Sequence, residues 1–179
     1  MNSGKALLII DVQVGIIDGL HAFKGAEVVE TINGLLSKAR SAGVPVLYVQ
    51  HDGDSGHVLE TNSPGWKIYP SIAPADGEPV IRKRASDSFF ETSLARELDT
   101  RGIGHLVVTG CATQYCIDTI CRRAVSLGYD VTLVSDAHTT VDDDNLSASQ
   151  IIKHHNSLLD GFDAGEHAVS VKPAESVRF

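Results

Sequence analysis

Short apolar runs alternate along the chain with segments in which apolar residues recur at helical spacing. The runs are rich in β-branched residues and cover positions 7–10, 44–49, 105–109, 131–134 and 168–171, which is typical of strands buried on both faces. Helical spacing is clearest at 32–39 and 151–159. This alternation predicts an α/β fold: a doubly wound, mostly parallel sheet in a three-layer αβα arrangement, with helices on both faces.

Glycines and prolines mark where these elements end. Gly43 and Gly128 each follow a helical segment and are expected at its C-terminus. The interval 52–78 contains many Gly and Pro residues and has no sustained period, so we expect an irregular and functional excursion. Since no linker, repeat or low-complexity tract interrupts the pattern, residues 1–179 are predicted to form one domain.

Composition and charge indicate which classes of partner are not expected. The chain has 179 residues, 42% of them hydrophobic, which is enough to build a sizeable core. Its formal net charge is -8, and its basic residues form no run longer than 82–84, so we expect no nucleic-acid partner. No apolar stretch approaches the roughly 20 residues that span a bilayer, and the first residues show no signal-peptide pattern. We therefore expect a cytoplasmic protein without a membrane partner.

The cysteines agree with a reducing compartment. There are three, Cys111, Cys116 and Cys121, an odd number within one short stretch, so a disulfide framework is not expected. Structural zinc sites use paired knuckles with a second pair further on, and the spacing here does not provide them.

Three reactive side chains are expected at one edge of the sheet. Asp11 follows the first apolar run, Lys83 ends the short run 79–82, and Cys116 follows the strand at 105–109. Ligands of open parallel sheets bind beyond the carboxyl ends of the strands. The placement predicts that these three groups converge.

Each of the three residues also has a simpler interpretation. With Thr113 as N-cap, Cys116 would lie in the first helical turn, where the helix dipole and a nearby ammonium group favour the nucleophilic thiolate, whereas most free cysteines are buried hydrophobes. Asp11 is a candidate general base or a cap for the loop that follows. Lys83 is a candidate partner or an exposed lysine, although strand alternation points it away from Arg82 and Arg84.

Four stretches, in order, resemble the isochorismatase-like cysteine hydrolases, the superfamily that also contains nicotinamidases and N-carbamoylsarcosine amidohydrolases. They are Leu8-Ile9-Ile10-Asp11-Val12-Gln13, Val80-Ile81-Arg82-Lys83 with Ser88-Phe89-Phe90-Glu91-Thr92, Gly110-Cys111-Ala112-Thr113-Gln114-Tyr115-Cys116, and the segment from Gly128-Tyr129 to Ser135-Asp136-Ala137. The similarity runs from about residue 5 to about residue 160.

The resemblance implies a catalytic triad of Asp11, Lys83 and Cys116 that cleaves a C–N bond (amide, ureide or lactam) of a small molecule through a thioester, without a cofactor. It also implies a cis peptide at Cys111-Ala112 and an oxyanion hole formed by the N–H groups of Ala112 and Cys116. Because isochorismatase proper hydrolyses a vinyl ether and typically lacks this cysteine, Cys116 favours amide chemistry. Family members are commonly dimers or tetramers, so a homo-oligomer is expected.

The resemblance is weaker in the region that corresponds to the metal site of nicotinamidases. His51, Asp52 and His57 are candidate ligands, but Gln50 occupies a position where a ligand is expected and the Asp/His order differs, so no metal is predicted. Two alternatives stay open: a metal-assisted nicotinamidase, and a non-catalytic or redox-sensing binding protein of the same fold. The candidate substrate contacts, each also open to a packing role, are Gln50, His51, Trp66, Phe89 and Tyr115.

Overall fold

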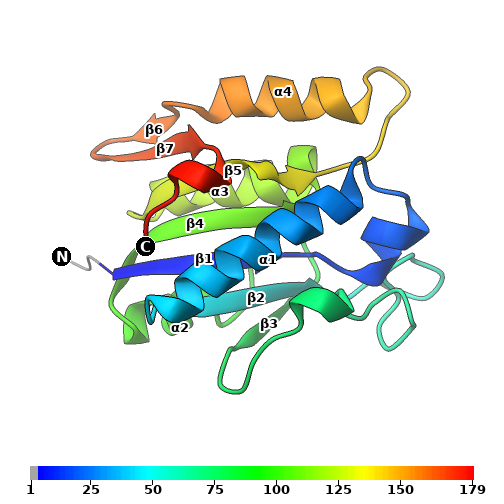
Figure 1. The fold of residues 1–179 in the computed structure, drawn as a ribbon, viewed down its shortest axis with the longest axis horizontal. Coiled ribbons are helices and arrows are strands. Elements are labelled where there is room, and N and C mark those ends of the chain that lie inside the picture. Colours follow the sequence, from blue (N-terminus) through cyan, green and yellow to red (C-terminus); the bar gives the residue numbers. More distant parts are fainter. Residues whose placement is uncertain (1–3) are drawn as a thin grey trace.

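The computed structural model describes residues 4–179, and a seven-stranded sheet forms its centre (Figure 1). The order of strands across the sheet is β3-β2-β1-β4-β5-β7-β6, and every neighbouring pair is parallel except β6 with β7. The strands are β1 (Gly4–Ile10), β2 (Val46–His51), β3 (Val80–Lys83), β4 (Ile103–Cys111), β5 (Asp130–Thr139), β6 (Asp163–Ala164) and β7 (His167–Lys172). The predicted mostly parallel sheet is confirmed.

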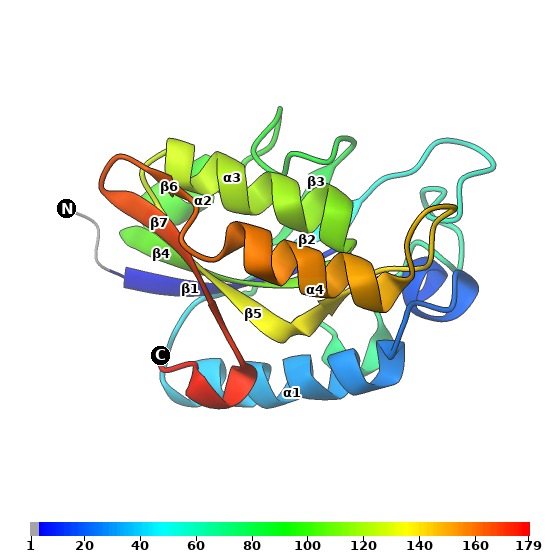
Figure 2. The same ribbon diagram turned by 90° about the horizontal axis from the view of Figure 1, so that it is seen from above.

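Helices cover both faces of this sheet, as predicted. Figure 2 shows α1 on one face and α2, α3 and α4 on the other. These helices are α1 (Gly25–Ser41), α2 (Leu94–Thr100), α3 (Asp118–Ser126) and α4 (Ala148–Leu159). Four short helical turns lie in the connections: η1 (Gly15–Gly19), η2 (Pro70–Ile72), η3 (Thr113–Ile117) and η4 (Ala174–Ser176). None of the helices in the described part of the chain has the length and hydropathy needed to cross a membrane.

Strand β1 shows why a continuous apolar run is needed at the centre. Its side chains alternate between the two faces: Leu7 and Ile9 join the core under α1, whereas Leu8 and Ile10 join the core under α2 and α3. Each of these four residues is at most 1% exposed. Burial of one such side chain stabilises the fold by roughly 1.5–3 kcal/mol.

The direction of winding reverses between β1 and β4. From β1 the chain passes through α1 to β2 on one side, and β3 is followed by α2 and then by β4 on the other side. Gly110 permits the close approach of the two strands at their carboxyl ends, because a Cβ there would overlap the carbonyl oxygen of Ile10 and its φ is +120°. A crevice for ligands is expected at such a reversal.

Most strands are longer than the apolar runs that predicted them, β5 most of all, and one strand begins later than predicted. Strand β2 begins at Val46 rather than Val44, because Pro45 has no N–H for the ladder, although its carbonyl still accepts from Leu7. Gly43 and Gly128 lie one residue beyond the helix caps, with positive φ. The interval 52–78 holds only the turn η2 and isolated bridges, so its predicted irregularity is also confirmed.

Candidate active site

The structure brings together the three side chains that the sequence placed at the carboxyl edge. Lys83 Nζ lies 2.7 Å from Asp11 Oδ2 and 3.1 Å from Cys116 Sγ. It also donates to the carbonyl of Ala85 at 2.9 Å. An ammonium group has three N–H donors, so these contacts occupy all of them and hold the lysine between the carboxylate and the sulfur.

Asp11 is placed by an unusual backbone conformation directly after β1. Its φ is +52°, and its N–H donates to the carbonyl of Val49 at 2.9 Å. The carboxylate is 2% exposed; Oδ2 accepts from Lys83, whereas Oδ1 is buried and has no hydrogen-bond partner within residues 4–179. An unpartnered carboxylate oxygen in a buried site is a ready proton acceptor.

Lys83 is a buried cation compensated by its neighbours. The exposed and buried positions of β3 alternate, so Lys83 points inward and Arg82 outward, as strand alternation predicts. Burial by itself would lower the pKa of Lys83, but the charges of Asp11 and then of Cys116 reverse the effect, and the pKa is raised overall. The ammonium form is therefore retained inside the protein.

The thiol of Cys116 differs from the sequence expectation. Burial, followed by the negative charge of Asp11, raises its pKa to about 12, and the opposing effect of Lys83 is smaller. Desolvation and the carboxylate thus outweigh the ammonium group, which differs from the expectation that the surroundings favour the thiolate. At neutral pH the sulfur carries a proton that a nearby base must remove before it can attack.

The turn that carries Cys116 is built differently from a capped α-helix. Element η3 is a π-type turn in which the carbonyl of Ala112 accepts from Tyr115 at 3.0 Å and from Ile117 at 3.2 Å. The peptide bond Cys111-Ala112 is cis. Thr113 makes no cap hydrogen bond, so its predicted role as N-cap is wrong.

Thr113 instead belongs to a buried hydrogen-bond chain that joins three elements. Its Oγ1 lies 2.9 Å from His138 Nδ1, and His138 Nε2 lies 2.8 Å from Asn156 Oδ1. Asn156 Nδ2 donates to the carbonyl of Ser135 at 3.1 Å, which fixes the amide orientation. Asn156 Oδ1 is an acceptor, so Nε2 of the neutral ring carries the proton, and the Thr113 hydroxyl donates to Nδ1.

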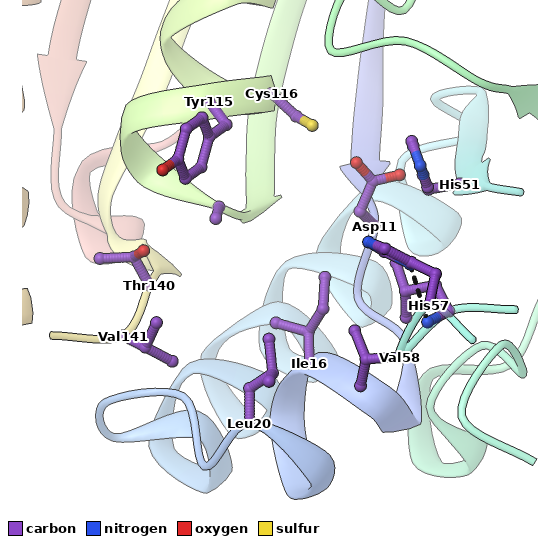
Figure 3. A pocket seen from close by; sticks show the side chains of 12 residues that line it. Asp11, Ile16, Leu20, His51, His57, Val58, Tyr115, Cys116, Thr140 and Val141 are labelled. Atoms are coloured by element: carbon purple, nitrogen blue, oxygen red, sulfur yellow. Dashed lines mark hydrogen bonds between the residues drawn. The ribbon is translucent and has the colours of Figure 1, made fainter. Parts of the chain in front are cut away.

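A cavity of about 250 Å³ opens beside the sulfur and the carboxylate (Figure 3). Most of its wall is apolar, and the side chains of His51 and His57 lie on the same side of it as Asp11 (Figure 3). Its lining residues are Asp11, Ile16, Leu20, His51, His57, Val58, Leu59, Ala112, Tyr115, Cys116, Thr140 and Val141.

Two of the five candidate substrate contacts line this cavity, His51 and Tyr115. The other three lie elsewhere and have packing roles. Gln50 is 4% exposed and donates to the carbonyl of Trp66. Trp66 stacks under the guanidinium of Arg82, whose carbon lies 4.3 Å from the ring centroid. Phe89 stacks on the ring of Tyr129 and packs against the core.

The sequence interpretation missed most of the cavity wall. Residues 16, 20, 58, 59, 140 and 141 follow the carboxyl ends of β1, β2 and β5, so the sheet-edge rule that selected the triad was also the signal for them. Gln13 was missed as well. Its side chain donates to the carbonyls of His51 and Trp66 and accepts from the N–H of His51. These hydrogen bonds hold the excursion 52–78 against the segment that follows β1.

Of the three candidate metal ligands, Asp52 is engaged by other side chains, and the two histidines are neighbours. The Asp52 carboxylate accepts from Arg82 Nε at 2.6 Å and from Trp66 Nε1 at 2.9 Å. The rings of His51 and His57 are neighbours, with centroids 5.7 Å apart. Within residues 4–179, no three His, Cys, Asp or Glu side chains are grouped as a metal ion would require.

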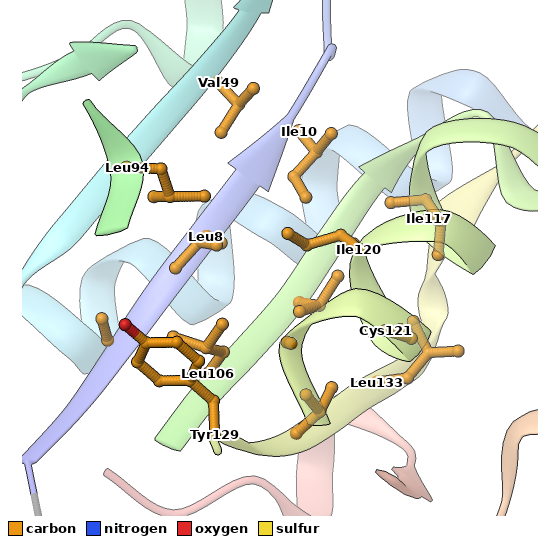
Figure 4. Packing of buried hydrophobic residues seen from close by; sticks show 14 of the residues in the cluster. Leu8, Ile10, Val49, Leu94, Leu106, Ile117, Ile120, Cys121, Tyr129 and Leu133 are labelled. Atoms are coloured by element: carbon orange, nitrogen blue, oxygen red, sulfur yellow. The ribbon is translucent and has the colours of Figure 1, made fainter. Parts of the chain in front are cut away.

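The other two cysteines are structural. Cys111 and Cys121 are fully buried, and burial raises the pKa of both thiols. Figure 4 shows Cys121 among the apolar side chains between α3 and the sheet, close to Ile120 and Leu133. Among the contacts of the described residues, the ammonium of Lys83 lies against the sulfur of Cys116 and against neither of these two.

Comparison with known proteins adds independent evidence. Residues 5–154 match the model of the isochorismatase domain. A streptothricin hydrolase from Streptomyces noursei is 38% identical over 77% of this chain and 50% of its own length, so the chain spans about half of that relative. A ureidoacrylate amidohydrolase from Caulobacter vibrioides is 31% identical over 74% of this chain and 75% of its own length.

The fold is similar to that of solved structures. An isochorismatase from Pseudomonas putida KT2440 superposes with a TM-score of 0.88 and is 31% identical in sequence. The superposition covers 97% of this chain and 90% of that protein.

Proposed function

This chain belongs to the isochorismatase family, and on that basis we propose that it is a cysteine-dependent hydrolase that cleaves a carbonyl C–N bond of a small molecule. Cys116 is the nucleophile, Asp11 the general base and acid, and Lys83 the cation that positions both. Two relatives are named for hydrolysis of streptothricin and of ureidoacrylate. These names support amide-type chemistry and leave the substrate open among amides, ureides and lactams.

The reaction begins with removal of the thiol proton. Asp11 takes the proton through its unpartnered Oδ1, and the sulfur attacks the carbonyl carbon of the substrate. The N–H groups of Ala112 and Cys116 are the proposed donors to the oxyanion that forms, and loss of one such donor typically costs on the order of 10²–10³ in rate. The ammonium of Lys83 stabilises the negative charge that passes between carboxylate and sulfur.

The leaving group and water complete the cycle. The protonated Asp11 gives its proton to the leaving nitrogen, the C–N bond breaks, and a thioester forms on Cys116. A water molecule then loses a proton to Asp11 and attacks the thioester carbon. The C–S bond breaks, the proton returns to the sulfur, and a carboxylic acid leaves, so the resting thiol and carboxylate are restored.

One observation carries this proposal: a single buried ammonium group contacts both the carboxylate and the sulfur, at 2.7 Å and 3.1 Å. A redox sensor needs a thiolate at neutral pH, and the raised pKa of Cys116 is unfavourable for that role. The metal-assisted alternative needs Asp52 as a ligand, but its carboxylate is engaged by Arg82 and Trp66.

The test is a screen of small amides, ureides and lactams for release of ammonia or amine. Cys116→Ala is expected to reduce turnover by at least about 10³-fold, because the nucleophile is lost. Cys121→Ala is the matched control, since this cysteine is fully buried in the core, and it should retain most of the activity. Equal turnover by wild type and Cys116→Ala would refute the proposal.

A further inference from the structure

The charges around the cavity restrict what the substrate can be. Its ionisable lining residues are Asp11, Cys116, Tyr115, His51 and His57, and no arginine is among them. Lys83 is not among the lining residues, and its three N–H donors contact Asp11, Cys116 and the Ala85 carbonyl. Within residues 4–179, the wall of this cavity therefore contains no lysine or arginine that could pair with an anionic substrate.

The two histidines of the wall are weak partners for an anion. The pKa of His51 is lowered by burial and, next, by the positive charge of Lys83, so its ring is neutral at pH 7. His57 Nδ1 accepts a hydrogen bond from the N–H of Leu59 at 3.0 Å. Because Nδ1 acts as an acceptor in this contact, it offers no N–H to a ligand.

The rest of the wall is formed by hydrocarbon groups. Ile16 lies in η1 and Leu20 directly after it, Val58 lies in the excursion after β2, and Val141 follows β5 (Figure 3). A carboxylate placed against these side chains would lose part of its hydration and would find no cationic partner among them, which is unfavourable.

We propose that the substrate is a compact amide whose remaining carbon skeleton is uncharged, so that this site selects against carboxylate-bearing amides. This inference rests on the proposed function, because it concerns the substrate of the same site. The cavity of about 250 Å³ is smaller than the roughly 300–1,000 Å³ pockets that hold drug-sized ligands, which limits the skeleton to a few carbon atoms beyond the amide.

Three nearly isosteric amides test the proposal: 4-methylpentanamide, succinamide and succinamate. The first two are neutral, and succinamate replaces the terminal isopropyl group of the first with a carboxylate. Dissociation constants are measured on Cys116→Ala by calorimetry or NMR titration at pH 8, and ammonia release is measured on the wild-type protein. We expect succinamate to bind at least about 30-fold more weakly than the neutral pair.

A charge introduced into the apolar wall should shift this preference. Leu20 is 47% exposed and lines the cavity, whereas Leu127 is 42% exposed and lies outside it. Leu20→Lys should improve the affinity for succinamate relative to 4-methylpentanamide by about fivefold, which is the range of one exposed ion pair. Leu127→Lys is the matched control and should leave that ratio unchanged.

The outcomes separate this inference from the proposed function. Succinamate binding as well as or better than the neutral amides, or no detectable binding of any of the three, overturns the inference, even if Cys116 still proves essential for hydrolysis of another compound. Preferential binding of the neutral amides without ammonia release supports the inference and counts against the hydrolase.

Discussion

At the scale of single residues, the site depends on the balance of charges around one sulfur. Cys116 has an anion and a cation as neighbours, and they act on its pKa in opposite directions. Asp11 stabilises the thiol, Lys83 stabilises the thiolate, and burial adds to the effect of Asp11. The carboxylate therefore keeps the nucleophile protonated at rest and is also the group that removes its proton.

This balance predicts that replacement of Asp11 speeds the alkylation of Cys116 and abolishes amide hydrolysis. Asp11→Asn removes the negative charge and leaves Lys83 beside the sulfur, so the pKa of Cys116 should fall and alkylation by iodoacetamide at pH 7.5 should become about 10–100-fold faster. The same variant should lose amide hydrolysis, because no base remains. The measurement is the alkylation rate followed by mass spectrometry, together with ammonia release.

Lys83→Met serves as the matched comparison and should slow alkylation below the wild-type rate, since it removes the cation. If Asp11→Asn also slows alkylation, the assigned roles of the two residues are wrong.

At the scale of elements, α4 is coupled to the turn of the nucleophile through His138. The chain Thr113–His138–Asn156 links η3, β5 and α4, and every polar side-chain atom of the histidine ring has a partner. Helix α4 is itself well fixed, because Ser147 and Gln150 form a capping box at its start. The position of Cys116 thus depends on a helix that contributes nothing to the cavity.

The coupling predicts a loss of stability in acid. Burial lowers the pKa of His138 to about 4, and the hydrogen bond with Asn156 opposes this only partly. The unfolded chain takes up this proton near the ordinary pKa of about 6.5, so the stabilisation is complete above pH 6.5 and is lost as the pH falls to about 4. The loss is on the order of 3 kcal/mol in free energy of unfolding.

Urea denaturation of the wild type and of His138→Gln at pH 7.5 and pH 4.5 measures this effect. The variant should be less stable at pH 7.5 but should lose much less stability between the two pH values. An identical pH dependence in the two proteins would show that His138 is not the group responsible.

At the scale of the whole molecule, the two halves of the sheet meet at β1 and β4, and the site lies where their carboxyl ends separate. Hydrophobic periodicity predicted most of the strands and the layers, because buried strands have few alternatives, and the sheet-edge rule predicted the convergence of Asp11, Lys83 and Cys116. Periodicity was not sufficient to predict which residues form the cavity wall. Trp66 and Phe89 are aromatic and near the motifs, yet tertiary packing directs them to Arg82 and Tyr129.

The junction of β1 and β4 should be intolerant of a side chain. Gly110→Ala would place a Cβ against the Ile10 carbonyl and would impose an unfavourable φ, so we expect a loss of at least about 3 kcal/mol in free energy of unfolding. Gly34→Ala is the control, because nothing lies within 4 Å of a Cβ at that position in α1, and it should stabilise by roughly 0.5–1 kcal/mol. Thermal and urea denaturation compare the two, and a fully stable Gly110→Ala would contradict the described packing.

The most direct test of the central claim is to trap the acyl group on the sulfur. An amide that is turned over is mixed with the protein, quenched in acid within milliseconds to seconds, and digested with trypsin, which releases residues 102–122 with all three cysteines. We predict that this peptide gains the mass of the acyl group at Cys116 alone, and that the adduct is absent in Asp11→Asn. Steady turnover with an unmodified Cys116 at every quench time, or an acyl group found on Cys111 or Cys121, would contradict the account.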